Sequence, residues 1–107
     1  MATLEEITDR IRHAAASDAD LGSAGLGASI RLELKGEGVI HIAGTEVSNA
    51  DLPADLIVTV SRADLEALGR RELDPVRAMM TGRLKLSDMG LAMRLQPQIR
   101  ALFSRAS

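Results

Sequence analysis

The 107-residue sequence has no cysteine, no tryptophan and no tyrosine, and its only phenylalanine is Phe103. Without cysteine the chain cannot form a disulfide, a thiolate nucleophile or a cysteine-ligated metal site. Stiff aromatic rings fill the interior of most domains, so this interior must be built from aliphatic side chains and the five methionines. A soft interior of this kind suits a flexible, chain-like ligand, and it suits an ordinary small core equally.

Targeting and membrane signals are also missing. The N-terminal Met-Ala-Thr-Leu-Glu-Glu is acidic and lacks the apolar segment of a signal peptide. No apolar run reaches the length of a transmembrane helix, and the C-terminal Arg-Ala-Ser differs from the peroxisomal Ser-Lys-Leu signal. We therefore expect a cytoplasmic protein, and the length predicts a single domain over residues 1–107.

The sequence contains none of the motifs that would indicate an enzyme. His13 and His41 fall on different predicted elements, and no H-E-x-x-H, G-x-S-x-G or Walker motif is present. Gly22, Gly25 and Gly27 form a loop that follows a helix and precedes a strand, the reverse of a dinucleotide-binding turn. Basic and aromatic residues are not interleaved, so we expect no nucleic-acid partner. A binding module without catalysis, metal or cofactor is favoured.

Charge is divided unevenly along the chain. Residues 1–69 hold five basic and twelve acidic residues, a net charge of −7, whereas residues 70–107 hold eight basic and three acidic residues, a net charge of +5. Such a division guides an anionic partner if the basic residues share one face. It is also expected if the two parts simply pack together with their charges in solvent, and the sequence leaves both interpretations open.

Alternating apolar and polar residues predict strands over residues 29–35, 39–43, 45–48 and 55–60, after a helix that begins at Thr3. A turn over residues 36–38 joins the first two strands. One apolar and one polar face indicate an antiparallel sheet with one face in solvent. His41 is predicted to be exposed on the polar face of the sheet. His13 is predicted to be a surface histidine on the first helix.

Short helices are predicted in the last part of the chain. Ser61 caps a helix that ends at Gly69, and Asp74-Pro75 opens another that ends at Gly82. A strand over residues 83–86 leads to a helix capped by Asp88, which Pro97 kinks or divides into two. The final stripe is an amphipathic lid or a plain core helix; its members are Leu91, Leu95, Ile99, Leu102 and Phe103.

The run TGRLKLSDMGLAMRLQ at residues 81–96 resembles the C-terminal signature of the sterol carrier protein 2 (SCP-2-like) domain family. In that signature a helix ending in Gly, a short (K/R)-L-K-(apolar) strand and a Met-Gly-Leu-Ala-Met-(Lys/Arg)-Leu helix start follow one another. Upstream, residues 55–68 and Leu73-Asp74-Pro75 match the family's strand, Ser-capped helix and Leu-Asn-Pro turn. The order of elements extends the resemblance to nearly the whole chain.

The resemblance implies an α+β fold: a five-stranded, mostly antiparallel sheet that helices cover on one face, with an apolar tunnel between them. It implies binding or transfer of a lipid, namely a fatty acyl chain, a phospholipid or a sterol-like molecule, and transient contact with an anionic membrane surface. An acyl chain is favoured over a rigid sterol because the interior has few flat surfaces. The alternative is a non-catalytic accessory or protein-interaction domain in a lipid or quinone pathway. The candidate lipid-binding residues are Leu65, Leu68, Met79, Met80, Leu86, Leu91, Leu95, Ile99, Leu102 and Phe103.

Overall fold

The computed structural model describes residues 3–17, 28–43 and 46–106. The predicted glycine-rich loop and the predicted interruption at Gly44 fall outside these ranges. Five helices and five strands are present in the described residues: α1 (Leu4–Ser17), β1 (Ile30–Leu34), β2 (Gly38–Ala43), β3 (Glu46–Ser48), β4 (Leu56–Val60), α2 (Arg62–Gly69), α3 (Pro75–Met80), β5 (Leu84–Leu86), α4 (Met89–Arg94) and α5 (Gln96–Ala106).

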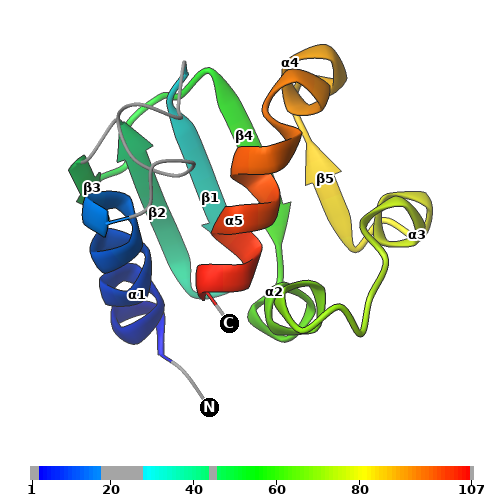
Figure 1. The fold of residues 1–107 in the computed structure, drawn as a ribbon, viewed down its shortest axis with the longest axis horizontal. Coiled ribbons are helices and arrows are strands. Elements are labelled where there is room, and N and C mark those ends of the chain that lie inside the picture. The colour runs from blue at the N-terminus through cyan, green and yellow to red at the C-terminus, as the bar shows by residue number, and fades with distance from the viewer. Residues whose placement is uncertain (1–2, 18–27, 44–45, 107) are drawn as a thin grey trace.

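The strands form one sheet in the order β3-β2-β1-β4-β5. β1 and β4 are parallel, and the other three neighbouring pairs are antiparallel. Helices α1 and α5 lie on the same face of this sheet (Figure 1). The predicted α+β fold with a mostly antiparallel five-stranded sheet is therefore confirmed. The turn between β1 and β2 occupies residues 35–37, one position earlier than predicted, because Gly38 already pairs with Leu34.

Alternation of side chains along the central strands builds the core. Leu32 of β1 lies beside Val58 of β4 in the parallel register, and both are fully buried beneath the helices. Along each strand, the residues that alternate with the buried ones point to the opposite face of the sheet. From the helices, Ile7, Ile11 and Leu102 are also fully buried and close the core from above.

Side chains that accept hydrogen bonds from backbone N–H groups begin the short helices where the sequence predicts them. Ser61 accepts from the backbone N–H of Asp64, and Asp88 accepts from that of Leu91 at 3.0 Å. The predicted division at Pro97 is also confirmed, since α4 ends at Arg94 and Pro97 lies in the first turn of α5. There its missing N–H costs nothing, because the first N–H groups of a helix lack an intrahelical partner.

Helix α2 ends at Gly69, as predicted. Gly69 is the last helical residue, and the left-handed position is occupied by Arg71, with φ of 63°. The N–H of Arg71 donates to the Leu68 carbonyl at 3.2 Å, and the N–H of Glu72 donates to the Ala67 carbonyl at 2.8 Å. These two bonds satisfy the last carbonyls of the helix and define a Schellman ending. The predicted end of the helix at Gly69 is confirmed, and the residue in the left-handed conformation is Arg71.

His41 differs from its prediction, because it is only 9% exposed. The segment between β3 and β4 crosses the outer face of the sheet, and His41 Nε2 lies 3.1 Å from the Pro53 carbonyl oxygen. Arg31 beside it donates to the Asp51 carboxylate and to the Leu52 carbonyl. The hydrogen bond to Asp51 raises the pKa of Arg31 above its ordinary value. Part of the face expected in solvent is therefore covered.

Candidate functional site

An apolar groove of about 390 Å³ runs between α3, β5, α4 and α5. In Figure 1, α3 and α4 lie at the two ends of β5, and α5 crosses the sheet beside β5. We call this feature the groove; its lining residues are Asp74, Pro75, Val76, Met79, Leu84, Leu86, Met89, Ala92, Met93, Gln96, Ile99, Arg100 and Phe103.

Helix α3 forms one wall of the groove because it is short and packs through one small residue. Ala78 is fully buried, whereas Val76 is 62% exposed and Met80 is 83% exposed. Each of the two lies two positions from Ala78, about 200° around the helix, so both point away from the core. Val76 lines the groove, but Met80 does not. The prediction that Met80 faces the interior was wrong for this reason.

Helix α4 forms a second wall of the groove, and it too packs on the core through one small residue. Its Ala92 is 5% exposed, and Met89 and Met93, one turn apart, are 48% and 72% exposed at the edge of the groove. Beneath them lie the nearly buried Leu84 and Phe103. The groove therefore has a buried aliphatic floor and a rim of flexible apolar side chains that are open to solvent.

The predicted lipid-binding residues fall into three groups. Met79, Leu86, Ile99 and Phe103 come together in the groove. Leu68 lies with Phe103 in the neighbouring hollow. The remaining residues lie outside both features: Leu65, Leu95 and Leu102 are buried in the core, Leu91 is half-buried, and Met80 is on the surface.

Sequence reasoning missed the three rim residues of the groove, Val76, Met89 and Met93. The four-residue spacing of Met89 and Met93 places them on one helix face, and this signal was available in the sequence. What the spacing did not show is that Ala92 contacts the core in place of the methionines.

A second hollow of about 440 Å³ adjoins the groove. The two features share Asp74, Pro75, Arg100 and Phe103. We call the second feature the basic hollow; its other lining residues are Leu68, Gly69, Arg71, Leu73 and Ser104. Because four residues belong to both linings, the groove and the basic hollow lie side by side.

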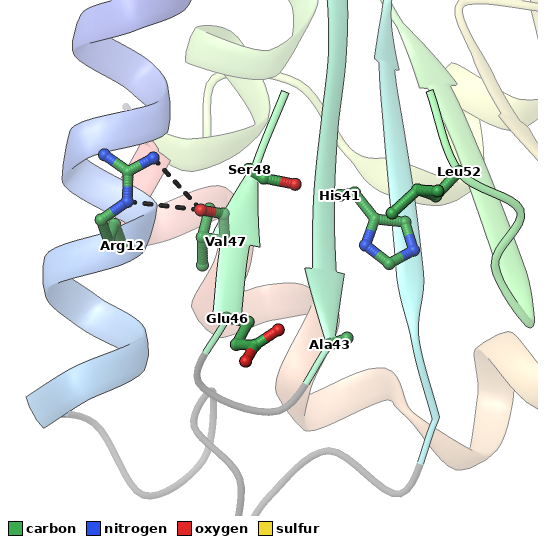
Figure 2. Close-up of a pocket in the computed structure, with 7 residues that line it drawn as sticks. All are labelled: Arg12, His41, Ala43, Glu46, Val47, Ser48 and Leu52. Carbon is green, nitrogen blue, oxygen red and sulfur yellow. Dashed lines mark hydrogen bonds between the residues drawn. The ribbon is translucent and has the colours of Figure 1, made fainter. Parts of the chain in front are cut away.

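A third hollow, of about 430 Å³, lies on the outer face of the sheet around β2 and β3 (Figure 2). Arg12 from α1 stands at its edge and donates to the Val47 carbonyl from Nε at 3.3 Å and from Nη2 at 3.1 Å, while its Nη1 lies 2.7 Å from an Asp9 carboxylate oxygen. His41 is engaged with the Pro53 carbonyl. Arg12 thus binds the edge strand β3, and His41 binds the segment that covers the outer face of the sheet.

Two structural features of other protein classes are absent from the described residues. No group of three or more histidine, aspartate or glutamate side chains there is arranged to hold a metal ion. Within the same ranges, none of the helices combines the length and the hydropathy that crossing a bilayer requires.

The comparison with protein families matches residues 5–100 to the SCP-2 sterol transfer family. The chain belongs to this family. The suspected resemblance is thereby confirmed over almost the whole sequence. Human stomatin-like protein 1 is 49% identical over 49 residues, which are 45% of this chain and 12% of that protein. Rabbit (Oryctolagus cuniculus) sterol carrier protein 2 is 41% identical over 54 residues, 50% of this chain and 10% of that protein. The chain thus spans only a small part of these curated relatives.

Solved structures of SCP-2 proteins share the fold. The crystal structure of sterol carrier protein 2-like 2 from Aedes aegypti superposes with a TM-score of 0.70 at 24% identity, covering 86% of this chain and 92% of that one. A solution structure of the palmitated form of the same mosquito protein superposes with a TM-score of 0.64 at 24% identity, covering 92% and 95%. At this identity the likeness establishes the fold, and it agrees with the α+β prediction.

Proposed function

We propose that this protein binds a lipid through a flexible hydrocarbon chain in the groove and carries it without chemical change. Membership of the SCP-2 family supports lipid binding or transfer in general. The observation that carries the proposal is the groove itself, with its buried floor at Leu84, Ile99 and Phe103 and its exposed rim at Met89 and Met93. A rim of methionines adapts to different chain positions because the side chain is unbranched and polarizable.

The size of the groove is compatible with such a ligand. Its volume of about 390 Å³ falls within the ~300–1,000 Å³ typical of small-molecule sites. Burial of ten methylenes would contribute roughly 8 kcal/mol at ~0.8 kcal/mol each, before the cost of association is subtracted. A chain is favoured over a rigid sterol because Phe103 is the only aromatic side chain in the lining.

The proposed exchange of lipid takes place at an anionic membrane surface. Helices α3 and α4 carry a group of individually exposed apolar side chains, namely Val76, Met80, Met89 and Met93. Residues 75–94, which contain this group, hold four basic residues and one acidic residue, so their net charge is +3. Exposed apolar side chains next to basic ones favour the interface of negatively charged bilayers. Flotation with vesicles should recover more protein when anionic phospholipid is included, and equal recovery from neutral vesicles would contradict this part of the proposal.

Native mass spectrometry of the purified protein, with lipid extraction from the same sample, tests the main proposal. We expect an adduct of acyl-lipid mass, and a delipidated sample should melt at a higher temperature after a fatty acid is added, because the ligand binds only the folded state. A bare protein mass and an unchanged melting temperature would refute the proposal. That result would favour the alternative, an accessory or protein-interaction domain, for which the exposed apolar group on α3 and α4 is a suitable contact surface.

A further inference from the structure

We propose that the basic hollow binds an anionic head group, a carboxylate or a phosphate, of the lipid whose chain occupies the groove. This inference rests on the proposed function and extends it by naming the class of ligand, an acidic amphiphile. Its basis is the shared wall of the two features, through Asp74, Pro75, Arg100 and Phe103. If the hydrocarbon chain of a lipid lies in the groove, its head group would therefore lie in the basic hollow, beside Arg71 and Arg100.

The two arginines line the basic hollow from different elements. Arg100 is on α5, and Arg71 follows the end of α2. The adjacent Arg70 lies 3.9 Å from the Glu72 carboxylate. In the described residues, by contrast, neither Arg71 nor Arg100 has a carboxylate within ion-pair distance. Both guanidinium groups are thus available to an external anion, with which an arginine forms paired, charge-assisted hydrogen bonds.

The acidic residue of the hollow does not cancel this charge. Asp74 lines both features, and its Oδ1 accepts the backbone N–H of Val76 at 3.4 Å as the cap of α3. Arg71, Arg100 and Asp74 together leave a net charge of +1 in the lining of the basic hollow. The groove beyond it presents mainly hydrocarbon. This division of polarity matches a single-chain acid better than a neutral sterol or alcohol.

The backbone at Arg71 is consistent with a role for its side chain. Its φ of 63° lies in the left-handed region, where glycine is the usual residue of a helix ending. A non-glycine residue there costs about 1–2 kcal/mol. Gly82, at the corresponding position after α3, has φ of 77°. Only the ending that borders the basic hollow uses arginine.

The test compares three ligands with the same ten-carbon alkyl chain: undecanoate, decyl phosphate and decanol. Their affinities for delipidated protein are measured by displacement of a fluorescent fatty acid below micellar concentrations. We expect undecanoate, decyl phosphate or both to bind roughly three- to tenfold more tightly than decanol, from two exposed charge pairs. The anion that shows the preference identifies carboxylate or phosphate as the head group.

Two double variants, each lacking two positive charges, distinguish anion binding in the basic hollow from attraction by the overall positive charge of this region. Arg71→Gln with Arg100→Gln should abolish the anion preference, so that this variant binds the anions no more tightly than it binds decanol. Arg77→Gln with Arg94→Gln, at exposed positions that line none of the three hollows, should retain most of the preference. If the first double variant is unstable, Arg71→Gly replaces Arg71→Gln, because glycine is favoured at this φ.

The outcomes distinguish the inference from the function beneath it. Equal binding of all three ligands, or an anion preference that survives loss of Arg71 and Arg100, would overturn the head-group site while the lipid-binding proposal stands. Equal losses in the two double variants would also overturn it, since general charge would then be sufficient. Failure of all three ligands to bind would refute the proposed function itself.

Discussion

Replacement of the rim methionines gives the sharpest test of the groove. Met89 and Met93 are 48% and 72% exposed in the unliganded structure, so mutation to glutamine removes little folding energy. A bound chain would cover part of this exposed surface. Full burial of a methionine contributes about 1.5–3 kcal/mol. If the chain covers half of what is exposed, the pair contributes roughly 1–2 kcal/mol, and the double variant should bind about five- to twentyfold more weakly.

The chain offers a matched control for this experiment. Leu52 and Met80 are 47% and 83% exposed and lie outside the groove. A double variant with both changed to glutamine loses nearly the same exposed apolar surface. Its affinity for monomeric decanoate, measured by titration calorimetry on delipidated protein, should equal that of the wild type. Equal weakening in the two double variants, or none in the rim variant, would refute the assignment of the chain to the groove.

Three further predictions concern stability, each measured by urea unfolding of the delipidated protein. Phe103→Ala should cost about 3–5 kcal/mol, because Phe103 is 3% exposed in the core; a loss below 1 kcal/mol would show that the site is loosely packed. Gly82→Ala should destabilise by about 1 kcal/mol because its φ is 77°; the new Cβ meets no atom within 4 Å, so the cost comes from the backbone alone. Gly90→Ala in α4 should be neutral or stabilising. A larger loss for Gly90→Ala than for Gly82→Ala would contradict the backbone argument. Ser61→Ala should cost about 1 kcal/mol by removing the cap of α2, and Ser61→Thr should restore most of it.

Local patterns in the sequence carried much of the fold. Strand alternation such as Ile30-Leu32-Leu34, the caps at Ser61 and Asp88, and the division at Pro97 all depend on residues within about four positions of each other. For that reason the predicted element order agrees with the structure. The family motif at residues 81–96 supplied what local patterns do not contain, the pairing of the strands into one mixed sheet.

The site was less accessible to sequence reasoning, because a groove depends on which face of each short helix packs inward. Met79 and Met80 were both predicted to bind lipid, but α3 contacts the core through Ala78, and of the two methionines only Met79 lines the groove. Likewise, Phe103 was predicted as a lining residue from its stripe, and its position at the junction of the groove and the basic hollow was visible only in the fold.

The sequence by itself determined the order of the strands and helices and the approximate position of each, the aliphatic character of the interior and the excess of basic residues after residue 69. Only the tertiary structure decided that His41 is covered by the segment containing Pro53, and that Arg71 and Arg100 line one hollow. The physical reason is the range of the interactions. Periodicity and capping act between neighbours along the chain, whereas burial and convergent charge depend on segments that meet only after the helices pack on the sheet.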